Sequence, residues 1–169
     1  MNCTAATQPI SVPRYAADDA TRPVAVQVLV NQQEGQQTPV GPGTVHHLAL
    51  PDHQDEAALK LALAALLSNA QVGLHLTLDG DEAFIWALHP VAREAGLLSE
   101  EITLRCTGSD RRLLFCVHCA TRQAGTGADV QNCRHCGVLL EVRRHFSERL
   151  GAYLGVCADA DQPYAQARP

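Results

Sequence analysis

The sequence lacks any apolar run of the ~18 to 20 residues that a membrane-spanning helix requires. Its first residues, Met1-Asn2-Cys3-Thr4, offer neither the basic nor the apolar segment of a secretory signal. We therefore expect no membrane partner and a cytoplasmic location. Basic residues are also few, with 13 Lys+Arg against 18 Asp+Glu. The resulting net charge of −5 argues against nucleic acid as the main partner.

Sequence motifs of catalysis and phosphate binding are absent as well. The chain contains no G-x-S-x-G, no G-x-G-x-x-G and no P-loop, and Pro42 within Gly41-Pro42-Gly43 has no N–H to offer a phosphate. Scattered histidines are usually solvated or paired with a neighbour. We therefore expect no catalytic residue and no cofactor-binding site on this chain. The scattered histidines are His46, His47, His53, His75 and His89.

The composition is that of a globular protein with two different parts. Hydrophobic residues make up 46% of 169 residues, which excludes a disordered chain and suffices for a core. Residues 1–104 carry 4 basic and 12 acidic side chains, whereas residues 105–149 carry 8 basic and 4 acidic ones. This asymmetry predicts two units with different surroundings.

Strands that alternate with helical segments predict a parallel α/β domain over residues 23–108, after a flexible leader at 1–22 that shows no period. Pro90 predicts a kink or break in the second helix, and Gly96 predicts its end. The predicted strands are 23–30, 44–50, 72–78 and 101–105, and the predicted helices are 52–69 and 81–97.

Four of the seven cysteines form the pattern C-x₂-C-x₁₃-C-x₂-C, from Cys116 and Cys119 to Cys133 and Cys136. A two-residue gap turns both sulfurs of a pair towards one point, and two such knuckles supply the four thiolates that Zn²⁺ prefers. We predict a Cys₄ zinc ribbon over residues 109–146. Its flanking strands are expected at 113–115 and 138–142, with a hairpin tip at 120–132. A closed Cys₄ shell is structural rather than catalytic.

Other interpretations of the cysteines remain open. The same four thiolates can hold one iron ion or an iron–sulfur cluster. Disulfides are disfavoured in a cytosolic chain. We expect His118 and His135 to lie outside the ligand shell. The remaining cysteines are expected to be small apolar residues, and they are Cys3, Cys106 and Cys157.

The tail combines basic and aromatic residues, and residues 147–169 are expected to form a C-terminal arm. Arginine and aromatic side chains are typical anchors of protein interfaces. The alternative is a strand end and a polar turn that pack on the ribbon. The predicted interface residues are Arg143, Arg144, His145, Phe146 and Tyr153.

A longer signature follows the second knuckle. After Gly137 come His145-Phe146-Ser147 and then Leu150-Gly151-Ala152-Tyr153-x-Gly155-Val156. Together with the two knuckles, this string resembles the C-terminal region of the DmmA-like subunit of bacterial dimethylamine monooxygenase.

The N-terminal part of the chain has a separate resemblance. Residues 73–80, the following helix and residues 92–97 are similar to the last β-α-β of the nucleotide domain of ferredoxin–NADP reductase. The Cys-Gly-Pro of that family is replaced here by Asp79-Gly80-Asp81, and Val30 leads into Asn31-Gln32-Gln33 without the glycine-rich turn. The resemblance therefore implies a Rossmann-like shell kept for packing rather than a dehydrogenase module.

The DmmA-like resemblance implies a role in a multi-subunit monooxygenase. That family demethylates dimethylamine to methylamine and formaldehyde with O₂ and NAD(P)H, and its other subunits carry haem b, FMN and a 2Fe-2S centre. The implied role is a non-catalytic accessory subunit that docks the haem oxygenase subunit and the flavin/iron–sulfur reductase subunit. The alternatives are a rubredoxin-like or iron–sulfur electron carrier and a nucleic-acid-binding zinc ribbon.

Overall fold

The computed structural model describes residues 12–16, 25–33, 43–108 and 110–161. The chain divides into two compact units. The described residues between 14 and 113 form the parallel-sheet unit, and residues 12–13 with 114–161 form the cysteine unit. Within the described part of the chain, no helix is both long and apolar enough to cross a membrane.

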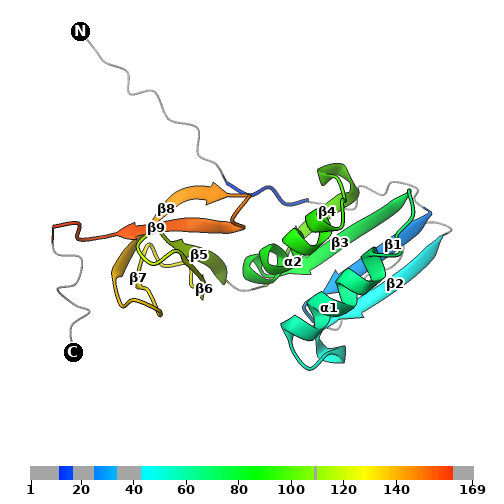
Figure 1. Ribbon diagram of the computed structural model, residues 1–169, viewed down its shortest axis with the longest axis horizontal. Coiled ribbons are helices and arrows are strands. Elements are labelled where there is room, and N and C mark those ends of the chain that lie inside the picture. Colours follow the sequence, from blue (N-terminus) through cyan, green and yellow to red (C-terminus); the bar gives the residue numbers. More distant parts are fainter. Residues whose placement is uncertain (1–11, 17–24, 34–42, 109, 162–169) are drawn as a thin grey trace, which may run out of the picture. The chain divides into compact units, whose positions relative to one another are not determined.

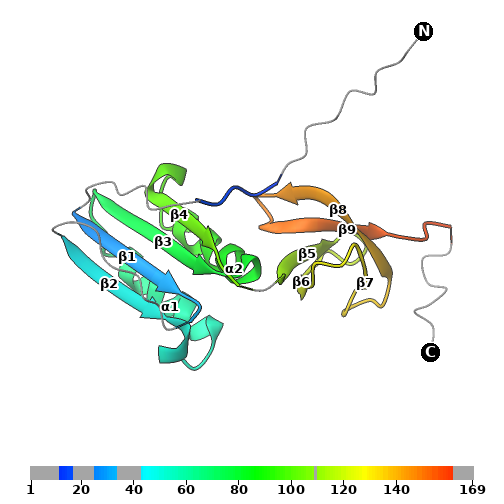
Figure 2. The same cartoon turned by 180° about the vertical axis from the view of Figure 1, so that it is seen from behind.

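The parallel-sheet unit is a two-layer α/β structure. Four parallel strands run in the order β2-β1-β3-β4, and α1 and α2 lie on the same face of this sheet (Figures 1 and 2). The prediction of a parallel α/β unit is therefore confirmed. Its elements are β1 (Val26–Asn31), β2 (Thr44–Ala49), η1 (Leu50–Asp52), α1 (Glu56–Leu67), β3 (Leu74–Gly80), α2 (Glu82–Glu94), η2 (Ser99–Glu101) and β4 (Ile102–Cys106).

Local capping explains where the helices begin and end. Asp55 and Asp81 are the N-caps, and each carboxylate accepts a hydrogen bond of 2.8 Å from the N–H three residues on. Of the kink or break predicted at Pro90, the break is wrong, because α2 continues through this residue to Glu94. Gly96 follows the helix with a φ of 93°, which suits glycine and ends the helix as predicted.

The core of this unit lies between the sheet and the two helices. Alternate residues of β1 and β3 point to the helix face, including the fully buried Val28 and Leu76. Apolar residues of both helices cover them and shield the strands from water. The helix residues with 0 or 1% exposure are Leu59, Leu63, Phe84, Ile85, Leu88 and Ala92.

The cysteine unit is a curled five-stranded sheet in the order β6-β5-β9-β8-β7. Strand β9 runs parallel to β5 and antiparallel to β8. The edge strands approach each other, because a Cβ on Gly125 of β6 would lie 2.6 Å from the Gln131 Oε1 of β7. The strands are β5 (Arg112–Cys116), β6 (Thr121–Gly125), β7 (Val130–Asn132), β8 (Leu139–Ser147) and β9 (Ala152–Cys157).

Two parts of this unit differ from the sequence-based expectation. Residues 120–132 are more than a hairpin tip, because they contain β6 and β7. Strand β9 lies within the segment assigned to a C-terminal arm, yet it occupies the middle of the sheet between β5 and β8. The pairing partners of β9 are distant in sequence, so local pattern does not reveal them.

Candidate metal centre

Four cysteine sulfurs meet at one end of the curled sheet. Cys116 ends β5 and Cys119 lies in the turn after it, while Cys133 and Cys136 lie in the turn between β7 and β8. All four Sγ atoms lie within 4.8 Å of one another. The Sγ–Sγ distance is 3.8 Å between Cys116 and Cys136 and 3.7 Å between Cys119 and Cys133.

These sulfur separations fit a tetrahedral metal ion. A tetrahedron with metal–sulfur bonds of about 2.3 Å has edges of about 3.8 Å between its sulfurs. The two measured pairs have this spacing without any rearrangement. The four cysteines can therefore hold one ion, and a Cys₄ shell would leave it no open position for a substrate.

The cluster is buried on one side and close to solvent on the other. Cys116 and Cys133 are 0 and 2% exposed, and Val138 and Leu140 pack against them. Cys119 and Cys136 are only partly buried. The buried half anchors the site in the core of the unit, and the other half brings two sulfurs near the surface.

Hydrogen bonds in the second knuckle hold its turn. The Gly137 N–H donates to the Cys133 carbonyl at 2.9 Å, and the Cys133 N–H donates to the Val138 carbonyl at 2.8 Å. Gln123 of β6 adds a link across the sheet, because its Oε1 accepts the Arg134 N–H at 2.8 Å and lies 3.7 Å from the Cys133 Sγ. Sequence reasoning missed Gln123, since nothing in its neighbourhood marks it as a partner of the second knuckle.

The protein environment shifts the cysteine pKa values in opposite directions. Burial raises the pKa of the Cys116 thiol to about 12, and it also raises the pKa of the Cys136 thiol. A hydrogen bond from the Thr121 side chain lowers the pKa of Cys119 to about 6. A bound metal ion deprotonates its cysteine ligands outright, so it would displace protons from the first two thiols.

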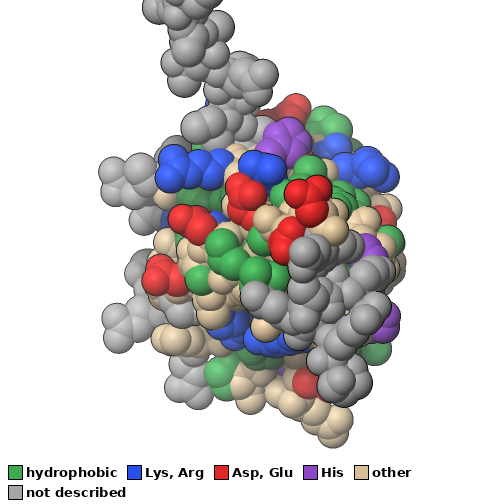
Figure 3. Space-filling view, turned by 90° about the vertical axis from the view of Figure 1, so that its left-hand side faces the viewer, with side chains coloured by type: hydrophobic (Ala, Val, Ile, Leu, Met, Phe, Trp, Pro, Cys, Tyr) green, Lys and Arg blue, Asp and Glu red, His purple; other side chains and the backbone are tan. Residues whose placement is uncertain are grey.

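The predicted interface residues do not share one environment. Arg143, Arg144 and His145 are exposed and form a bulge, because these three residues of β8 lie opposite the single Leu154 of β9. Phe146 is 2% exposed and packs edge-on against Tyr153, with ring centroids 5.1 Å apart. Figure 3 shows Lys and Arg side chains gathered in a row on one face, beside Asp and Glu side chains.

The parallel-sheet unit closes the place where doubly wound sheets bind ligands. Such sites lie at the carboxyl ends of neighbouring strands whose connections leave in opposite directions, here β1 and β3. The Gln32 carboxamide bridges this gap, donating to the Asp81 Oδ2 at 2.9 Å and accepting the Asp81 N–H at 2.6 Å. The Arg111 guanidinium lies 3.5 Å from the same carboxylate. The chain's own side chains therefore bridge the carboxyl ends of these two strands.

The histidines remain dispersed in the structure. His46 and His47 are exposed on β2, the His75 imidazole is 2.8 Å from the Thr103 hydroxyl, and His89 packs on Trp86. Among the described residues, the four cysteines are the only group of His, Cys, Asp or Glu arranged to hold a metal. Neither His118 nor His135 joins that group, although both lie within the knuckles.

Comparisons with known proteins agree with the sequence signature of the C-terminal part of the chain. Residues 103–156 match the family described as dimethylamine monooxygenase subunit DmmA-like, C-terminal domain. The heme-dependent oxidative N-demethylase delta subunit of Ectopseudomonas mendocina (strain ymp) is 50% identical over an alignment of 175 positions, and the alignment covers all of both chains. No solved structure matches the chain.

Proposed function

This chain belongs to the DmmA-like family of dimethylamine monooxygenase subunits, and we propose that it is a non-catalytic, zinc-binding accessory subunit of such an enzyme. In this proposal the complex demethylates dimethylamine to methylamine and formaldehyde with O₂ and NAD(P)H. Haem b, FMN and the 2Fe-2S centre belong to the haem oxygenase and reductase subunits. This chain holds those subunits together.

The arrangement of the four cysteines supports the structural part of the proposal. Four sulfurs within 4.8 Å of one another, two of them buried in the core, suit an ion that links the turns of the curled sheet. We interpret the cysteine unit as a zinc ribbon held by Cys116, Cys119, Cys133 and Cys136. When bound, Zn²⁺ would supply folding free energy and no redox chemistry.

The contacts that bridge the carboxyl ends of β1 and β3 support the proposal that this chain is non-catalytic. Asp81 is 2% exposed and its carboxylate is engaged by Gln32, the Phe84 N–H and Arg111. We interpret this unit as a Rossmann-like shell whose ligand crevice is used for packing.

An iron-based electron carrier is the second candidate function. The partial burial of Cys119 and Cys136 favours it, because a Cys₄ iron site near the surface can exchange electrons with a partner. The same four residues serve both candidates, so the identity of the metal decides between them.

Metal analysis combined with reconstitution tests the proposal. The chain is purified alone and with the other subunits, and its metal content and visible spectrum are recorded. We expect one zinc per chain, no visible absorption, no N-demethylase activity of the chain alone, and loss of activity when the complex lacks it. A coloured, reducible iron site would support the electron carrier, and full activity without this chain would overturn the proposal.

A further inference from the structure

Strand β2 is an edge strand of the parallel-sheet unit. Strand β2 is the last strand on its side of the sheet, and among the described residues no strand pairs with its outer edge. The Thr44 N–H donates to the Ala25 carbonyl at 3.1 Å, so the backbone of Thr44 points towards β1. Because backbone groups alternate along a strand, the N–H groups of Val45 and His47 point away from β1.

Strand β2 also lacks the features that usually protect an edge strand. Its sequence Thr-Val-His-His-Leu-Ala contains no Lys, Asp, Glu or Pro, and its register with β1 is continuous over all six residues. Natural edge strands are commonly blunted by charges, proline or bulges. The opposite edge strand, β4, carries Arg105, and the Ala16 N–H donates to its Leu104 carbonyl at 2.8 Å.

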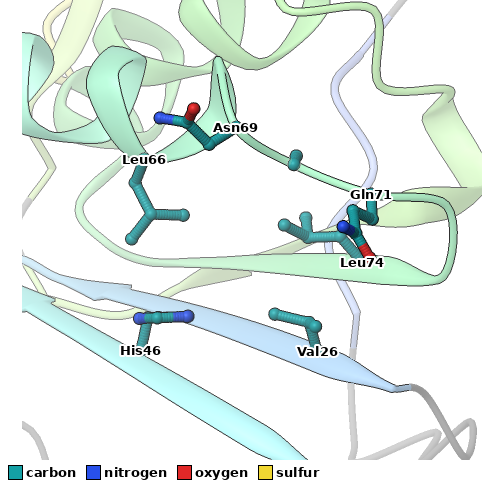
Figure 4. Close-up of a pocket in the computed structure, with 7 residues that line it drawn as sticks. Val26, His46, Leu66, Asn69, Gln71 and Leu74 are labelled. Atoms are coloured by element: carbon teal, nitrogen blue, oxygen red, sulfur yellow. The ribbon is translucent and has the colours of Figure 1, made fainter.

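A cavity of about 320 Å³ lies beside this edge, between β2, β1 and the end of α1 (Figure 4). Its wall is mainly apolar and includes Val26, Leu66 and Leu74. His46 of β2 is both exposed and part of the wall, so the cavity reaches the edge strand on the helix face. Val72, which follows the lining residue Gln71 in sequence, is fully exposed.

We propose that the edge of β2 is a docking site for an extended segment of another subunit of the N-demethylase complex, which adds a fifth strand to the sheet and places an apolar side chain at the cavity. This inference rests on the proposed function. Unpaired backbone donors and acceptors recognise an extended polypeptide, and a neighbouring pocket accepts its side chain. The 50% identical relative is a delta subunit, which favours a different subunit over a second copy of this chain.

Proline substitutions on β2 test the backbone pairing directly. His47→Pro removes an N–H that points outwards and leaves the N–H groups that face β1 in place. We expect this variant to fold and to bind the other subunits about tenfold more weakly. His47→Ala keeps the N–H and should bind like the wild type. His46→Pro is the matched control, because it removes an N–H that faces β1 and should destabilise the sheet itself.

Hydrogen exchange of the full complex gives a second measurement. We expect the Val45 and His47 amides to exchange quickly in the free chain and slowly in the complex. If His47→Pro binds as tightly as the wild type and the β2 amides of the complex still exchange quickly, this inference is overturned and the proposed function is not. A wild-type chain that fails to bind any other subunit would overturn the proposed function as well. A dimer of the free chain that His47→Pro abolishes would overturn the choice of partner.

Discussion

Ala120 and Gly137 occupy equivalent positions in the two cysteine knuckles. Each residue directly follows the second cysteine of its pair, and each has a positive φ, 55° for Ala120 and 72° for Gly137. Among the described residues, Ala120 is the only non-glycine residue with a positive φ. An L-residue in this left-handed region costs roughly 1 to 2 kcal/mol, which glycine avoids. The first knuckle therefore carries backbone strain that the second one lacks.

Relieving that strain should stabilise the cysteine unit. We expect Ala120→Gly to raise its free energy of unfolding by about 0.5 to 1 kcal/mol, since the strain relieved exceeds the added flexibility of the unfolded chain. The reciprocal change Gly137→Ala should lower it by about 1 kcal/mol or more. Calorimetric unfolding of the metal-loaded chain measures both. Destabilisation by Ala120→Gly would contradict the strain at Ala120.

Removing one cysteine ligand should unfold the cysteine unit. In Cys116→Ser or Cys136→Ser, the metal is lost together with the folding free energy that it supplies. Metal content and the dispersion of the amide NMR signals of residues 114–161 report the effect. Cys106→Ser is the control, because Cys106 is exposed and lies outside the cluster. A dispersed spectrum of this region after metal removal would refute the prediction.

Metal affinity should rise steeply with pH. Burial raises the pKa values of Cys116 and Cys136, so both thiols are protonated at pH 7 in the metal-free chain and must lose their protons to bind the ion. With at least two protons released, affinity increases about a hundredfold or more per pH unit near neutrality and falls on acidification. Calorimetry in buffers of different ionisation enthalpy counts the protons. Release of fewer than two at pH 7 would contradict this prediction.

The Gln32–Asp81 bridge should contribute to the stability of the parallel-sheet unit. Gln32→Ala leaves the buried Asp81 with fewer partners, at a cost of about 1 to 3 kcal/mol. Gly80→Ala should cost a similar amount by overpacking, because its Cβ would lie 2.6 Å from Phe84 and 2.8 Å from Gln32. Urea unfolding followed by the fluorescence of Trp86, the only tryptophan, reports on this unit. The exposed Gln33→Ala should change stability by less than about 0.5 kcal/mol.

Measurements of binding and of stability should distinguish the buried residues of the predicted interface from the exposed ones. Phe146→Ala removes a buried ring and should lower stability by about 3 to 5 kcal/mol. Arg144→Glu reverses an exposed charge on the β8 bulge and should weaken binding to the other subunits without unfolding the chain. Thermal unfolding and pull-down assays distinguish these effects. Unchanged binding by Arg144→Glu would remove Arg144 from the proposed interface.

The elements of the parallel-sheet unit were largely predictable from local pattern. The four strands and two helices lie within a few residues of their expected positions, because β-branched runs, helix formers, capping residues and, in some elements, apolar periodicity mark them locally. Pro90 misled the prediction, since packing of α2 on the sheet outweighs the loss of one helical hydrogen bond. Strands β6 and β7 were missed because they are short and polar.

The cysteine spacing alone identified the four residues that meet. Each C-x₂-C turn brings its own two sulfurs together, and the two turns form one cluster when the chain between them folds back. Tertiary structure alone decided the rest. It buried Phe146 while exposing Arg144, bridged β1 and β3 through Gln32 and Asp81, and placed β2 at the edge of the sheet that the described residues form. The physical reason is that burial and strand pairing depend on residues distant in sequence, whereas the knuckles depend on near neighbours.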